Sequence, residues 1–139
     1  EEKGILVGAP SLWKGRRPQL SDLKGKTLLS SANRLEDWSL WCAAVGQPHL
    51  QPAGKIQFGF SLLMYQAALE GLGVCIAQPE FIEDELASGR LVAPFANVVT
   101  TGKRYYLVCP SRIRNDPAIS QFFAWVSNRS VQINTEMQH

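Results

Sequence analysis

One stretch in the middle of the chain, FSLLMYQAALEGLGVCIAQP at residues 60–79, constrains the fold more than any other. Ser61 precedes a run of strong helix formers, and a serine hydroxyl in this place can cap a helix N-terminus. Gly71 ends the helix, because glycine suits the position after a last helical turn. The apolar run at 74–77 has the length of a buried strand, and Pro79 suits the first turn of another helix. The stretch therefore predicts an α/β arrangement.

Strands and helices alternate along most of the remaining sequence. Apolar runs and periodicity predict strands at 5–9, 27–30, 55–59, 91–95 and 104–109, and helices at 35–45, at 80–88 and from 116 onward. Such alternation is typical of a twisted, mostly parallel sheet flanked by helices, as in a Rossmann-like subdomain. The fold class that the sequence predicts is therefore α/β.

The size and charge of the chain exclude several classes of partner. A length of 139 residues fits one domain, and 45% hydrophobic with 19% charged residues is typical of a soluble globular chain. A net charge of +2 gives no reason to expect direct binding to nucleic acid. No apolar stretch approaches the roughly 18 residues of a membrane span, so we expect no membrane partner. The chain opens on EEKGILVGAP without a start methionine, and we expect it to be a fragment of a longer protein.

Catalytic and metal chemistry have little support in the sequence. The three cysteines, Cys42, Cys75 and Cys109, lie in a predicted helix and in apolar runs, so we expect free thiols in a reducing compartment. No cysteines or histidines have the spacing of metal ligands. No serine has the context of a nucleophile elbow. We therefore expect no enzyme, no catalytic residue, no metal and no cofactor, and an enzyme remains the weakest alternative.

Polar side chains at strand ends and at one helix start suit a ligand site better. In open α/β sheets, ligands bind outside the carboxyl ends of strands, and a helix N-terminus favours an anionic or carbonyl group. Each side chain also has a structural alternative: Ser61 as a cap, Tyr105 in packing and Arg34 in solvent. The candidate residues are Ser30, Ser31 and Arg34 after one strand, Ser61 at the helix start, Gln78 after another strand, and Tyr105 in the last strand.

Several blocks together resemble LysR-type transcriptional regulators. The blocks are TLLSS, EDWSLWCAAVG, FSLLMYQAALEGLGVCIAQPEFIEDELASGRLVAPF, YYLVCP and FFAWV, and they extend from about residue 6 to 126. The branch that they resemble is typified by the glycine-cleavage activator and the β-lactamase regulator. The resemblance implies a cytoplasmic bacterial regulator with a fold like a type 2 periplasmic binding protein. In that fold, two α/β subdomains enclose a cleft for a small-molecule effector.

The resemblance also implies a division of the chain and a set of effector contacts. Residues 1–103 would form the second regulatory subdomain, and residues 104–139 would supply a strand and helix of the first. The winged helix-turn-helix that binds DNA in such regulators would lie outside this sequence. Effector contacts would come from Phe60, Ser61 and Tyr105, with the loop at 30–34 as a further contact. Phe60 stands where similar proteins can have a small polar residue, which suggests a more apolar pocket.

The implied partners are a small-molecule effector, other copies of the chain in a dimer or tetramer, and DNA through the missing domain only. RNA polymerase is a candidate partner of the intact protein. The alternative is a periplasmic-type solute-binding protein, which would have a secretory signal upstream in place of the helix-turn-helix. Because half of the first subdomain is missing, we also expect the fragment to pair with itself through residues 104–109, or to aggregate.

Overall fold

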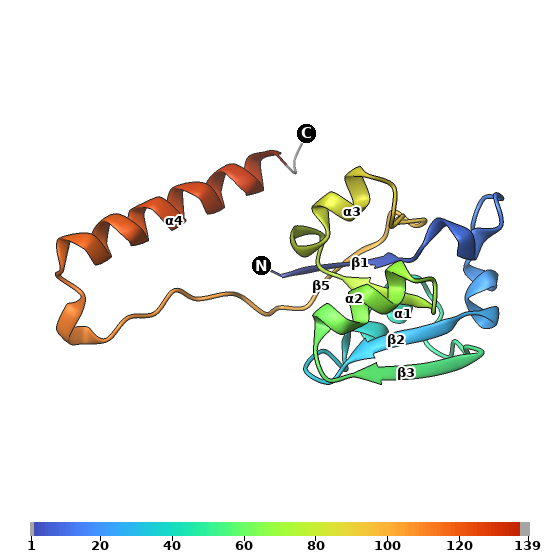
Figure 1. The fold of residues 1–139 in the computed structure, drawn as a ribbon. Coiled ribbons are helices and arrows are strands. Elements are labelled where there is room, and N and C mark those ends of the chain that lie inside the picture. Colours follow the sequence, from blue (N-terminus) through green and yellow to red (C-terminus); the bar gives the residue numbers. More distant parts are fainter. Residues whose placement is uncertain (1, 137–139) are drawn as a thin grey trace. The chain divides into compact units, whose positions relative to one another are not determined.

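The computed structural model describes the backbone of residues 2–136 and the side chains of residues 2–129 (Figure 1). The chain divides into two compact units, Glu1–Arg104 and Tyr105–His139.

The first unit is built on a mixed sheet of five strands in the order β3-β2-β4-β1-β5. β2 lies between β3 and β4 and is parallel to both, whereas β1 lies between β4 and β5 and is antiparallel to both. The predicted α/β class is confirmed. The prediction of a mostly parallel sheet holds for the direction of the strands, since all strands except β1 run the same way, but two of the four strand pairs are antiparallel. No local pattern encodes the reversal of β1. The strands are β1 (Lys3–Val7), β2 (Thr27–Ser31), β3 (Gly54–Phe58), β4 (Val74–Ala77) and β5 (Val98–Thr100).

Two hydrophobic clusters cover the two faces of this sheet. Side chains alternate along a strand, so Leu28 packs with α1 (Asp37–Ala44) and Leu29 packs with α2 (Ser61–Leu69). Trp41 is the large fully buried residue on the α1 side, and Met64 is its counterpart on the α2 side. A strand buried on both faces is a continuous apolar run, which explains why β4 was the clearest strand in the sequence.

The end of α2 agrees with the sequence prediction, and its start does not. Gly71 has φ +76°, and the N–H of Leu72 donates to the Ala67 carbonyl at 3.0 Å, which closes the helix as the glycine predicted. At the other end, Phe60 has extended backbone angles and is the N-cap, while Ser61 is the first helical residue. The prediction that Ser61 caps the helix is therefore wrong, because its side chain makes no capping hydrogen bond.

The predicted strand at residues 91–95 is also wrong. In residues 91–95, only Val92 pairs, in an isolated bridge with Gly8, because Pro94 has no N–H to donate to a ladder. The edge strand β5 lies a few residues later, in a segment for which the sequence predicted no strand. The predicted helix at 80–88 is divided into a 3-10 turn, Pro79–Phe81, and the short helix α3 (Glu83–Ala87). Two further 3-10 turns, Pro10–Trp13 and Leu20–Gly25, connect β1 to β2.

The second unit consists of an extended segment, a 3-10 turn at Ser111–Ile113 and the helix α4 (Pro117–Glu136). The strand predicted at 104–109 does not form, because no strand of the described residues pairs with this segment. Apolar side chains of this unit are exposed, with Tyr106 at 76% and Val108 at 83%.

Candidate functional site

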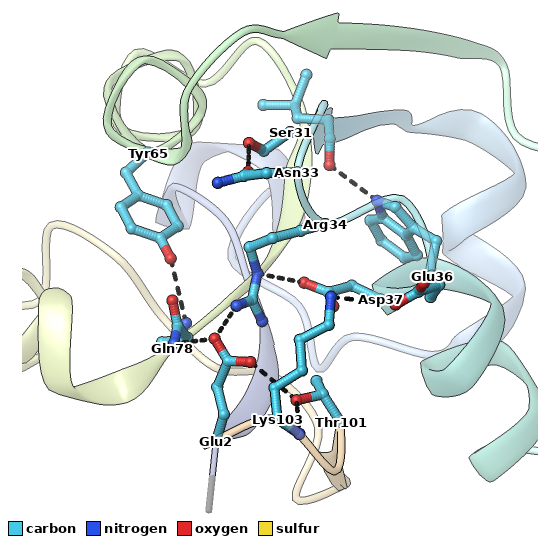
Figure 2. Close-up of polar contacts among 12 residues, drawn as sticks. Glu2, Ser31, Asn33, Arg34, Glu36, Asp37, Tyr65, Gln78, Thr101 and Lys103 are labelled. Carbon is cyan, nitrogen blue, oxygen red and sulfur yellow. Dashed lines mark hydrogen bonds and ion pairs between the residues drawn. The ribbon is translucent and has the colours of Figure 1, made fainter. Parts of the chain in front are cut away.

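A buried polar network lies beyond the carboxyl ends of β2 and β4, and Arg34 is at its centre (Figure 2). Arg34 comes from the loop between β2 and α1, and its Nε donates to Asp37, the first residue of α1, at 2.6 Å. The Nη1 of Arg34 donates to the carboxylate of Glu2, immediately before β1. All three side chains are only 5–6% exposed. The alternative that Arg34 is a solvated loop residue is therefore wrong.

Glu2 connects this ion pair to two more segments of the chain. The side-chain amide of Gln78, directly after β4, donates to one carboxylate oxygen of Glu2. The hydroxyl of Thr101, directly after β5, donates to the other oxygen at 2.8 Å. The backbone supports the same junction, because the N–H of Glu2 donates to the Lys103 carbonyl at 2.9 Å. The network thus joins the start of β1 to the segment after β5 and to the ends of β2 and β4.

The pKa values of the two carboxylates of the network are shifted in opposite directions. Burial by itself would raise the pKa of Glu2, but the hydrogen bond from Thr101 and the charge of Arg34 together hold it below its usual value. Burial raises the pKa of Asp37, and Arg34 only partly opposes this effect. Arg34 stays charged, because Asp37 and Glu2 raise its pKa against the effect of burial. Among the described residues, Arg34 Nη2 and Asp37 Oδ1 are buried without a hydrogen-bond partner.

Tyr65 of α2 reaches the same region from the other side. Its hydroxyl accepts a hydrogen bond from the backbone N–H of Gln78 at 3.3 Å. Burial raises the pKa of Tyr65 to about 12, so the phenol stays neutral at ordinary pH. Burial also raises the pKa of the Cys75 thiol in β4 to about 12. Cys75 is therefore a packing residue without nucleophilic character.

The structure brings only some of the predicted site residues together. Arg34 and Gln78 are in the network, and the neighbouring Ser31 is fully buried and donates to the side chain of Asn33. Ser30 points to the opposite face of the sheet, where it lines a separate pocket. The remaining three lie elsewhere: Phe60 is 70% exposed, Ser61 is half-buried, and Tyr105 belongs to the second unit and is 73% exposed.

Sequence reasoning missed four members of the network: Glu2, Asp37, Tyr65 and Thr101. The spacing of Arg34 and Asp37 at i and i+3 across a helix start was a usable signal for their ion pair. Glu2 and Thr101 gave no signal, because 99 positions separate them in the sequence. In the part of the chain that the structure describes, no three His, Cys, Asp or Glu side chains are grouped to hold a metal ion. Within residues 2–136, every helix is too short or too polar to cross a lipid bilayer.

The model of one protein family, described as the LysR substrate binding domain, matches residues 1–130. The chain belongs to this family. The LysR substrate-binding domain was the family that the sequence blocks resembled, and the resemblance is confirmed. The glycine cleavage system transcriptional activator of Escherichia coli K12 is 33% identical over 124 residues, which cover 88% of this chain and 40% of that protein. The transcriptional activator AmpR of Rhodobacter capsulatus is 36% identical over 112 residues, which cover 81% of this chain and 38% of that protein.

These relatives are transcriptional regulators, which confirms the predicted branch, and they give no support to the enzyme alternative. The LysR-type chain described here spans about two fifths of their length. The effector domain of AmpR from Pseudomonas aeruginosa is 28% identical, has a TM-score of 0.78 and is matched over 100% of this chain and 66% of that one. The AmpR effector-binding domain from Citrobacter freundii, at 24% identity and a TM-score of 0.69, matches 91% of this chain and 62% of that one. The fold is therefore that of LysR effector-binding domains, which is like a type 2 periplasmic binding protein.

Proposed function

We propose that this chain is the effector-sensing part of a bacterial LysR-type regulator that binds DNA. The family match and the names of the relatives support this function. Residues 1–103 would form the second regulatory subdomain, and residues 104–139 would belong to the first. The boundary between the two compact units, after Arg104, supports this division. DNA would be bound by a winged helix-turn-helix outside this sequence.

The effector would bind beyond the carboxyl ends of β2 and β4, next to the start of α2. The observation that carries this proposal is the half-buried Ser61, whose hydroxyl makes no hydrogen bond with any described residue. The first turn of a helix also leaves backbone N–H groups unpaired, and these groups favour a carboxylate or a carbonyl oxygen. Phe60 beside it would supply an apolar contact, and Tyr105 would complete the site from the other subdomain.

The neighbouring network would set the shape of one wall of this site. Arg34 and Gln78 are held by Glu2, so an effector that touches them meets side chains whose positions are already fixed. An effector that binds one arrangement of the two subdomains better than another shifts the population toward that arrangement. The difference in affinity between the arrangements is the free energy available to control the DNA-binding domains.

The substitution Ser61→Ala in the complete regulator tests the site. Because Ser61 does not cap α2, its loss should change the free energy of unfolding by less than about 0.5 kcal/mol. The loss of a hydrogen bond to a charged effector group costs about 1.5–3 kcal/mol, which is roughly ten- to a hundredfold in affinity. Binding is measured by calorimetry with whichever compound, from a panel of amino acids and small carboxylates that includes glycine, raises the melting temperature of the wild type.

The exposed Ser21→Ala is the matched control for this experiment, because Ser21 makes no hydrogen bond with a described residue. Wild-type affinity in the Ser61→Ala protein would contradict the proposed role of Ser61. A solute-binding protein, the earlier alternative, is not favoured, since the relatives are regulators. The first ~90 codons of the parent gene, a domain-sized stretch, should encode a helix-turn-helix rather than a secretory signal.

The remaining partners follow from the same proposal. The intact regulator would act in the cytoplasm as a dimer or tetramer, with RNA polymerase as a candidate partner. The exposed apolar side chains of the second unit support self-association of this chain in isolation. The proposed regulator needs no cofactor.

A further inference from the structure

A second pocket lies on the face of the sheet covered by α1, and the proposed function does not use it. Its volume is about 310 Å³, at the lower end of the range for small-molecule sites, and it has room for about ten water molecules. Ser30 lines this pocket, whereas its neighbour Ser31 is buried on the other face of β2. The lining includes Leu28, Ser30, Trp38, Ser39, Cys42 and Lys55.

The apolar wall of the pocket is rigid. The indole N–H of Trp38 donates to the Leu29 carbonyl at 2.8 Å, which fixes the orientation of the ring. Trp41 supports the same ring from behind in an edge-to-face contact, with the ring centroids 6.2 Å apart. An apolar group that enters the pocket therefore meets a preformed aromatic surface, and little ordering of side chains opposes its binding.

The lining of the pocket includes one positively charged residue, the exposed Lys55. Lys55 makes no ion pair with any described residue, and its charge acts on the Cys42 thiol across the pocket. Burial raises the pKa of that thiol, so Cys42 adds no negative charge at neutral pH. Ser30 and Ser39 are the other polar residues of the lining, and both hydroxyls already donate to backbone carbonyls. An aromatic wall with one unpaired cation fits a ligand that has an apolar body and a single negative charge.

We propose that this pocket binds a small monocarboxylate with a compact aromatic or branched aliphatic body of about ten non-hydrogen atoms. The carboxylate lies against Lys55, and the body lies against Trp38 and Leu28. This site is distinct from the proposed effector site at Ser61, so the two proposals can fail separately.

The test uses the 139-residue chain with benzoate as the probe and benzyl alcohol as its neutral counterpart. Binding is followed by nuclear magnetic resonance through the indole N–H of Trp38 and the backbone amides of Ser39 and Lys55. Benzoate should give saturable shifts at all three positions. Lys55→Gln should weaken benzoate binding about three- to fivefold, the upper part of the range for an exposed ion pair, and leave the affinity for benzyl alcohol unchanged.

Two controls keep the test specific. Lys24→Gln removes an exposed lysine that is not in the pocket lining, and it should not change benzoate binding. Ser39→Leu fills the pocket from an exposed position of α1 and should abolish the shift at Trp38. The proposal is overturned if no saturable shift occurs at Trp38, if Lys55→Gln binds benzoate as the wild type does, or if Ser61→Ala is the variant that weakens benzoate.

Discussion

Arg34 provides the sharpest test of how the first unit is held together. The substitution Arg34→Gln keeps a hydrogen-bonding side chain of moderate length and removes the positive charge. Glu2 and Asp37 would then face each other as two buried carboxylates, each 5% exposed. We expect the free energy of unfolding of this unit to fall by about 3–5 kcal/mol, the usual cost of removing one partner from a buried ion pair.

The structure explains why Arg34→Gln should lower the free energy of unfolding so much, and what limits this loss. Two carboxylates share the single guanidinium, so its removal leaves both without a cation in the buried part of the network. Asp37 already has a raised pKa, and it can take up a proton to limit the penalty. A variant that also carries Asp37→Asn should therefore recover a large part of the loss, because replacing buried charges together costs less than leaving one unpaired.

Urea unfolding followed by tryptophan fluorescence measures the effect. A Trp125→Phe background confines the signal to the first unit, which contains Trp13, Trp38 and Trp41. Arg90→Gln is the matched control, since Arg90 pairs with Glu85 at 2.9 Å but is 60% exposed, and such a surface pair contributes at most about 1 kcal/mol. If Arg34→Gln cost no more than Arg90→Gln, the network would not be the element that stabilises this end of the sheet.

Two further predictions concern buried groups. The pKa of Tyr65 is raised to about 12, so its contribution to stability is present below pH 10 and is lost between pH 10 and 12. Tyr65→Phe should remove about 2 kcal/mol of this alkaline loss, measured by urea unfolding at pH 8 and pH 11.5. Gly73→Ala should destabilise the chain by at least about 2 kcal/mol, because the new Cβ would lie 2.3 Å from the Thr27 carbonyl oxygen. Gly25→Ala, where a Cβ meets open space, should be within about 0.5 kcal/mol of the wild type in the same thermal melts.

The parts of the fold that the sequence predicted are those with a local cause. Gly71 ended α2 as expected, because its positive φ and the Leu72 hydrogen bond involve neighbouring residues. β4 was clear from its apolar run, since a strand buried on both faces admits few polar side chains. Segment 104–109 has the same apolar character and forms no strand, because a strand also needs a neighbour to pair with. An apolar run therefore became a buried strand only where a neighbouring strand was present to pair with it, since the apolar side chains of segment 104–109 are exposed.

The residues of the candidate site also divide into those that local sequence predicts and those that depend on distant parts of the chain. Arg34 and Gln78 were found because polar residues that follow buried strands lie at one edge of the sheet. The sequence predicted Ser61 as the N-cap, whereas Phe60 is the N-cap and Ser61 is the first helical residue. Sequence alone does not distinguish the last extended residue from the first helical one. Glu2 and Thr101 were missed because their contact depends on β1 and β5 being neighbours, which no local pattern encodes.

The position of Glu2 and Thr101 bears on how an effector could act through this chain. The two residues lie at the start of β1 and directly after β5, and they share a hydrogen bond although 99 positions separate them. In the proposed division, the chain would cross to the first subdomain after residue 103, shortly after Thr101. Arg34 and Gln78 hold Glu2 from the effector side of the network, so a ligand that displaces either side chain also changes the restraint on a crossover. A variant of the network should therefore change the response to an effector even where the affinity for that effector is unchanged. Such a result would separate the transmission of the signal from the binding of the effector.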